Sequence, residues 1–138
     1  MSAVIEQAVE ARLVASAPCM DVVPAVLGYA CADPYTVRMT FPAAATLEGV
    51  EVVWEFSREL LAAGLEGPAG LGDVRVRPYG HGRTVVEFHA CEGVAVIHLR
   101  TGELRDFLRR ALDLVPAGRE HLHLDLDGRL ARLLRDAY

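Results

Sequence analysis

The stretch YACADPYTVRMTF, residues 29–41, places an Asp-Pro pair between two apolar runs that each have the composition of a strand. Pro34 has its φ fixed near the value that the second position of a β-turn requires, and the Asp33 side chain can hydrogen-bond to nearby backbone. After the turn, residues 36–41 alternate between polar and apolar side chains, as a half-buried strand does. We therefore expect a β-hairpin in which Asp33 and Pro34 form the reversal and fix the register of the two strands.

Six further segments have the composition or the alternation of strands. In the first, Ile5, Val9, Ala11 and Leu13 fall on one side of a two-residue alternation, although its alanine and glutamate content would also suit a helix. Pro24 can open the next, because the start or edge of a strand tolerates a missing N–H donor. Trp54 shares one face of a later strand with two apolar neighbours. The predicted strands are residues 4–15, 24–30, 36–41, 50–56, 74–78, 84–90 and 94–99.

Three helices are expected between and after these strands. Ser57 offers a side-chain oxygen that can cap the first helix, and Gly64 suits the left-handed residue that ends a helix. Thr101 can cap the second helix, whose apolar residues recur at helical spacing. After a short extended piece at residues 122–126, Asp127 can cap a terminal helix.

Together these elements predict a single domain, residues 1–138, of the α+β class and mainly β. Short turns between successive strands imply antiparallel pairing. We expect two antiparallel sheets in a β-β-β-β-α then β-β-β-α layout, followed by a C-terminal helix.

The charge of the chain bears on the partners that it can bind. Fourteen basic and nineteen acidic residues give a net charge of −5, whereas a protein that neutralises phosphates is usually basic. No apolar run approaches the length of a membrane span and the N-terminus lacks the features of a signal peptide, so we expect a cytoplasmic protein. Cys19, Cys31 and Cys91 lie in apolar stretches and are expected to pack as free thiols.

The sequence contains no recognisable set of catalytic residues. Its glycine cluster at residues 67–72 precedes a strand, whereas a phosphate-binding loop follows a strand and opens a helix. His121 and His123, with Asp125 after them, could supply metal ligands, but the same alternation with leucine is typical of a solvated strand face. We expect no catalytic site, no cofactor and no metal centre.

Arg75, Arg77 and Arg83 are the features that most favour a nucleic-acid surface. The first two alternate with valines, and a basic sheet face near an aromatic such as Tyr79 can bind single strands. The acidic net charge and the scarcity of aromatic residues favour pairing of these arginines with carboxylates or with a protein partner. Single-stranded nucleic-acid binding is therefore the alternative function.

Several short motifs, taken in order along almost the whole chain, resemble the SsgA-like proteins of filamentous actinomycetes. No single motif is diagnostic of that family, whereas the ordered set is specific. The motifs are Tyr29-x-x-Ala-Asp-Pro-Tyr35, Thr40-Phe41, Trp54-x-Phe56-x-Arg58-x-Leu60-Leu61-x-x-Gly64-Leu65, Pro68-x-Gly70-x-Gly72-Asp73-Val74-Arg75-Val76, Phe107-Leu108, Val115-Pro116-x-Gly118-x-Glu120-His121 and Asp125-Leu126-Asp127.

This resemblance implies a non-enzymatic regulator of cell division and sporulation septation, which recruits or positions the FtsZ ring at the septum. It also implies a Whirly-like fold and a bell-shaped trimer, with FtsZ or another SsgA-like protein as partner. Asp33, Pro34, Trp54 and Gly64 are expected to have structural roles. The loop at residues 42–49 is longer than is usual in the family.

Overall fold

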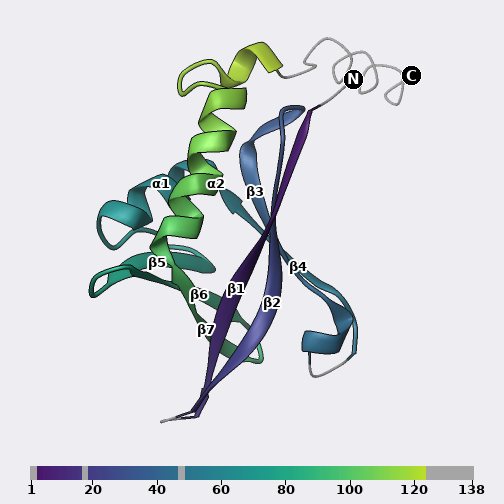
Figure 1. The fold of residues 1–138 in the computed structure, drawn as a ribbon, viewed down its shortest axis with the longest axis vertical. Coiled ribbons are helices and arrows are strands. Elements are labelled where there is room, and N and C mark those ends of the chain that lie inside the picture. The colour runs from purple at the N-terminus through teal and green to yellow at the C-terminus, as the bar shows by residue number, and fades with distance from the viewer. Residues whose placement is uncertain (1–2, 17–18, 47–48, 124–138) are drawn as a thin grey trace.

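The structure is a computed structural model that describes residues 3–16, 19–46 and 49–123. Seven strands and two α-helices follow one another in the expected β-β-β-β-α, β-β-β-α order (Figure 1). No helix of the described residues is long and apolar enough to cross a membrane. The elements are β1 (Val4–Ser16), β2 (Cys19–Ala30), β3 (Asp33–Phe41), the 3-10 turn η1 (Ala43–Ala45), β4 (Val52–Ser57), α1 (Arg58–Glu66), β5 (Val74–Tyr79), β6 (Arg83–Ala90), β7 (Gly93–Arg100), α2 (Thr101–Leu114) and the 3-10 turn η2 (Glu120–His123).

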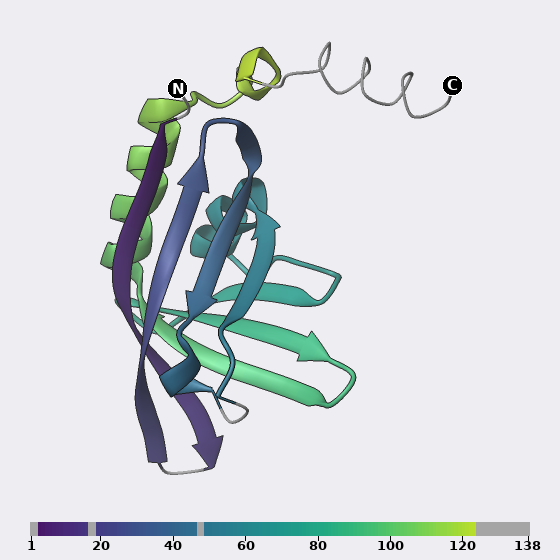
Figure 2. The ribbon, with the colours of Figure 1, turned by 90° about the vertical axis from the view of Figure 1, so that its right-hand side faces the viewer.

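All seven strands belong to one antiparallel sheet, in the order β4-β3-β2-β1-β7-β6-β5. The expectation of two sheets is therefore wrong. The cause is β1, which pairs with β2 along its length and, through residues 11–13, also with residues 97–99 of β7. Figure 2 shows that the sheet is strongly curled, so that β5, β6 and β7 run across the direction of β1 to β4.

Both helices pack against the inner face of this curled sheet, where the hydrophobic core lies (Figure 1). In β3 the alternation predicted from the sequence is confirmed, since Val37, Met39 and Phe41 are buried. In α2 the helical spacing is confirmed by the burial of Leu104 and Phe107. The largest fully buried side chains of the core cluster are Phe88, Phe107, Leu27, Met39, Leu61, Leu99, Leu104, Val37, Val76, Val86 and Val115.

The hairpin at residues 29–41 forms, but its turn lies earlier than the sequence pattern predicts. Ala30 pairs with Asp33, so residues 31 and 32 make the turn and Asp33 opens β3. The assignment of the reversal to Asp33 and Pro34 is therefore wrong, because a proline with a suitable φ can stand beside a turn as well as in it.

Pro34 instead lies in a β-bulge. Tyr29 is paired with Val37, and the shift of register before the next pair leaves residues 34–36 of β3 without partners on β2. A bulge tolerates proline because that position needs no N–H donor for the ladder. The Tyr29 hydroxyl donates a hydrogen bond of 2.9 Å to the Pro34 carbonyl, so a side chain fixes the shape of the bulge.

Gly64 does not end the first helix, contrary to expectation. Ser57 is the N-cap as predicted, and its side chain accepts the N–H of Leu60 at 2.9 Å, but the helix continues to Glu66. A Cβ on Gly64 would overlap the side chain of Val76 in β5. Glycine is therefore required at this position for the close approach of α1 to the sheet.

Two other boundaries differ from the prediction. β2 begins at Cys19, so Pro24 lies inside the strand. There β2 is paired with β1 on one side, whereas its pairing with β3 begins only at Val26. Thr101 is the first residue of α2 and makes no capping hydrogen bond. Its hydroxyl lies 2.8 Å from that of Thr84, which competes with capping.

At the C-terminal side, the extended piece predicted at residues 122–126 is wrong in its first part, because residues 120–123 form a 3-10 turn. The remainder of that piece and the helix predicted after Asp127 lie outside the described residues.

The two edges of the sheet differ. At the β5 edge, Ala69 and Val76 exchange two backbone hydrogen bonds of 2.8 and 2.9 Å, so the segment before β5 covers the middle of that strand. At the β4 edge, no segment within the described ranges pairs with the outer side of the strand. Val52 and Val53 of β4 are 37% and 47% exposed.

Replacing Gly64 by alanine should destabilise the protein by about 1–3 kcal/mol, because the added methyl group overpacks the contact with Val76. Alanine is the better helix former by about 1 kcal/mol, so packing and propensity act in opposite directions. The matched control is Gly102→Ala in α2, where a Cβ meets nothing within 4 Å. Urea denaturation should show a loss of stability for the first variant alone, and equal stability of both would contradict the packing role.

Candidate interaction site

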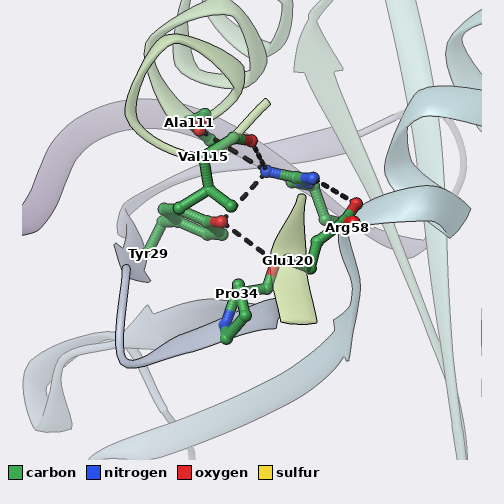
Figure 3. A network of polar contacts seen from close by, with 6 residues as sticks. All are labelled: Tyr29, Pro34, Arg58, Ala111, Val115 and Glu120. Atoms are coloured by element: carbon green, nitrogen blue, oxygen red, sulfur yellow. Dashed lines mark hydrogen bonds and ion pairs between the residues drawn. The ribbon is translucent and has the colours of Figure 1, made fainter. Parts of the chain in front are cut away.

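A buried arginine organises the end of the molecule where the two helices meet the β2–β3 hairpin. Arg58 is the first residue of α1 and is only 5% exposed. Its Nη1 donates to the Tyr29 hydroxyl at 3.0 Å and to the Val115 carbonyl at 2.6 Å, and its Nη2 lies 2.6 Å from a carboxylate oxygen of Glu120 (Figure 3). A buried guanidinium is tolerated only when it has this many partners.

The Arg58 network also closes the C-terminal end of α2. The last carbonyls of an α-helix lack intrahelical partners, and that end carries a partial negative charge. Arg58 supplies both a hydrogen bond to the Val115 carbonyl and a longer one, 3.5 Å, to that of Ala111. A cation on α1 thus takes the place of a conventional cap on α2.

Tyr29 connects this cation to the hairpin. Its ring centroid lies 5.5 Å from the Arg58 guanidinium carbon, and its hydroxyl accepts from Arg58 while donating to Pro34. Burial raises the pKa of the Tyr29 hydroxyl, so it stays protonated and can act as a donor at neutral pH. The bulge that contains Pro34 is therefore joined to both helices through a single phenol.

Glu120 provides the negative charge of the network from η2. Hydrogen bonding by its own backbone N–H, and then the Arg58 guanidinium, hold the pKa of its carboxyl below the ordinary value. The carboxylate is thus ionised at neutral pH and fixes the 3-10 turn against the N-terminus of α1.

Beside the network lies an open groove of about 460 Å³ between α1, the end of α2 and β3. Its apolar side comes from Leu108 and Leu112 of α2, and Tyr35 at its rim is 48% exposed. Arg58 and Glu120 form the charged end. A groove with an apolar side and a charged end has the chemistry of a protein contact surface.

The residues expected to be structural occupy different parts of the fold. Pro34 belongs to the Arg58 network (Figure 3), and Asp33, the residue before it, starts β3. Trp54 lies far from them, stacked on Phe88 with ring centroids 4.7 Å apart. It lines a separate apolar pocket of about 150 Å³ at the open end of the core.

The metal ligands considered from the sequence are not brought together in the part of the chain that the structure describes. His121 is exposed, and no cluster of three histidine, cysteine or acidic side chains occurs within those ranges. The His123 side chain and Asp125 lie outside them. Cys31 and Cys91 are free thiols, but Cys91 is exposed in the β6–β7 turn and is not packed as expected.

The three arginines proposed for a nucleic-acid surface have different surroundings. Arg77 forms an ion pair with Glu87 of β6, as the carboxylate-pairing interpretation predicts. Arg75 donates to the Gly72 carbonyl at 3.4 Å. Arg83 is half-buried at the start of β6.

The Arg58 network itself was not predicted from the sequence. Arg58 and Glu120 belong to the motifs that carry the family resemblance, but 62 positions separate them. The available signal was a single arginine directly after the capping Ser57, on a helix face that is otherwise apolar.

Replacing Tyr29 by phenylalanine should lower the free energy of unfolding by about 1–3 kcal/mol, because it leaves a buried Arg58 donor and the Pro34 carbonyl without a partner. Tyr35→Phe is the matched control, since Tyr35 is half exposed. Chemical denaturation measures both variants. A loss of equal size in the control would show that the effect is not specific to the network.

The stability that Glu120 provides should depend on pH. A carboxyl whose pKa is lowered in the folded state stabilises the protein above its unfolded pKa of about 4.3, and the contribution is lost as the pH falls through the folded value. Glu120→Gln should therefore be less stable than wild type at pH 7, and the difference should shrink and disappear as the pH falls from neutral through the folded pKa. Urea unfolding across this range, with the exposed Glu92→Gln as control, checks the prediction. A difference independent of pH would contradict it.

The chain is similar to known proteins over most of its length. The family model "Streptomyces sporulation and cell division protein, SsgA" matches residues 23–120. The sporulation-specific cell division protein SsgB of Streptomyces coelicolor is 43% identical over 129 residues, covering 91% of this chain and 92% of the relative. SsgB of Salinispora tropica is 41% identical over 133 residues, covering 94% and 92%.

Solved structures agree with these sequence matches. One, described by the words "Mutations in SsgB correlate to longitudinal cell division during sporulation of Streptomyces coelicolor", has a TM-score of 0.79 and 40% identity and covers 89% of this chain and 97% of its own. The SsgA-like sporulation-specific cell division protein of Thermobifida fusca has a TM-score of 0.82 and 31% identity, covering 95% and 96%. The chain therefore belongs to the SsgA family of sporulation and cell division proteins.

Proposed function

We propose that this protein is a non-enzymatic adaptor of the SsgB type, which acts in sporulation septation by recruiting or positioning the FtsZ ring. The observation that carries the proposal is the 43% identity, over 91% of the chain, to a protein named as a sporulation-specific cell division protein. Identity at this level over nearly the whole length favours a shared role in cell division during sporulation.

The placement of the shared motifs supports an adaptor role. Tyr29, Pro34, Arg58 and Glu120 come from three of the motifs, and they form a network that holds helices and hairpin together. Their contacts are with one another and with backbone carbonyls. Residues used in this way maintain a surface, whereas a catalytic set needs a nucleophile and a base directed at a shared reaction centre.

The proposed active form is a homo-oligomer of a single SsgA-like domain, a bell-shaped trimer with a Whirly-like fold. Support comes from apolar side chains at the open β4 edge, where Val52 and Val53 are substantially exposed. An edge strand with unpaired backbone groups and exposed valines favours pairing with another chain. The proposed partners of the trimer are FtsZ or another SsgA-like protein in the cytoplasm at the division septum.

Single-stranded nucleic-acid binding, the alternative considered from the sequence, receives no support from the relatives. The names of these relatives concern sporulation and cell division. The net charge of −5 also opposes binding to a phosphate backbone.

Complementation tests the proposed function. Expression of this chain in a Streptomyces coelicolor strain that lacks SsgB should restore septation during sporulation, and the purified protein should co-sediment with FtsZ filaments. The empty vector is the control for the first experiment, and filaments without the protein are the control for the second. Failure of both would overturn the proposal.

The oligomer is tested in the same set of experiments. Light scattering should give about three times the chain mass, and Val53→Lys at the β4 edge should shift the protein towards monomer through charge repulsion between copies. Leu71→Lys is the matched control, because Leu71 is fully exposed in a loop. A wild-type protein that stays monomeric at high micromolar concentration would contradict the trimer.

A further inference from the structure

A buried patch lies on the face of the sheet opposite the helices. Val85 of β6 pairs with His98 of β7, and directly paired residues in an antiparallel sheet project to the same face. Their neighbours Val86 and Ile97 belong to the core cluster under the helices, so Val85 and His98 point away from it. Nevertheless Val85 is 0% and His98 only 5% exposed.

Arginines surround this patch. Arg77 of β5 pairs with Val85, and Arg12 of β1 pairs with His98, so one row of side chains runs across four strands. The row spans about 14 Å, because neighbouring strands lie about 4.8 Å apart. Arg83 is two residues from Val85 along β6 and so faces the same side. We name the set Arg12, Arg77, Tyr79, Arg83 and His98 the outer basic face.

The carboxylates near the outer basic face do not neutralise it fully. Arg77 is paired with Glu87, and Arg12 lies 3.4 Å from Glu10. Within the described residues Arg83 forms no ion pair. Three guanidinium groups against two carboxylates leave a local positive charge on a chain whose net charge is −5.

His98 supplies an independent observation at the same place. Its Nδ1 is buried and has no hydrogen-bond partner, and the ring of Tyr79, itself 54% exposed, packs edge-on against its ring at 4.8 Å between centroids. Burial, and then the charges of Arg83 and Arg77, lower the pKa of His98. A buried imidazole without a hydrogen-bond partner therefore lies directly beside the arginines of this face.

We propose that the outer basic face binds an acidic, extended segment of a protein partner, with carboxylates at alternate positions. In an extended chain such carboxylates are about 6.7 Å apart, so a segment of four to five residues crosses the row from Arg77 to Arg12. The exposed ring of Tyr79 offers apolar contact beside the charges. Glu10 and Glu87 stand among the arginines and repel any anionic ligand, so the choice of a peptide over nucleic acid rests on the proposed adaptor role and on the relatives, whose names concern sporulation and cell division.

This inference rests on the proposed adaptor role, because an adaptor needs a surface for its partner in addition to its contacts with other copies. It also predicts a link to protonation. Carboxylates placed near the arginines offset the charges that disfavour imidazolium, so they raise the pKa of His98 relative to the free protein, and binding tightens as the pH falls. The charged and titratable groups on the part of this face that surrounds His98 are Arg75, Arg77 and Tyr79 of β5, Arg83, Glu87 and His89 of β6, Arg100 of β7, and Glu10 and Arg12 of β1.

Calorimetry with the full chain tests the proposal. The probe is a short synthetic peptide in which glutamate alternates with alanine, compared with its glutamine counterpart and with a single-stranded oligonucleotide of equal charge. The acidic peptide should bind at low salt and lose affinity at high salt. The double variant Arg77→Gln, Arg83→Gln should bind it about tenfold more weakly. Arg109→Gln is the matched control, because Arg109 is 71% exposed on α2, away from this face.

Further readouts separate the outcomes. NMR titration of the His98 ring should show its pKa rising on addition of the acidic peptide, and melting temperatures should confirm that the variants stay folded. No peptide binding at low salt, equal binding by the double variant, or tighter binding of the oligonucleotide would each overturn the proposal. If peptide binding fails while the trimer and complementation persist, the adaptor role stands and only the assignment of this face is lost.

Discussion

The structure depends on one buried guanidinium group, whose hydrogen bonds and charge must be matched by partners within the protein. Arg58 is stable in its position only because Tyr29, Val115 and Glu120 supply hydrogen bonds and a compensating charge. These partners come from the hairpin, the end of α2 and the turn that follows it. A single cation therefore determines how three segments are placed relative to one another, and the groove beside it takes its shape from that placement.

β1 has a comparable role in the sheet. Because β1 pairs with both β2 and β7, strands β1–β4 and strands β5–β7 form one curled sheet with a single inner face. Both helices can therefore pack into the same core. The opposite, outer face carries the arginines that surround His98. Assembly and recognition can thus use separate surfaces, with the β4 edge at one end of the sheet and the outer basic face near the other.

Local patterns predicted much of this fold from the sequence. The alternation of Val37, Met39 and Phe41 and the spacing of Leu104 and Phe107 are consequences of burying one side of a strand or a helix, and both are confirmed. The predicted position of the turn was wrong because the φ of Pro34 suits a turn and a bulge equally. In the bulge, the missing N–H of proline costs no ladder hydrogen bond. The single sheet and the Arg58 network could not be predicted, because both depend on contacts between residues far apart in the chain, such as Arg58 with Glu120 at a separation of 62 positions.

The two backbone hydrogen bonds between Ala69 and Val76 have a consequence for the size of any assembly. A sheet that could accept strands on both margins would permit head-to-tail addition without limit and would form filaments. Here the middle of one margin is covered by the chain itself, through the bridge between Ala69 and Val76. Unlimited head-to-tail growth of the sheet is therefore opposed at the β5 margin.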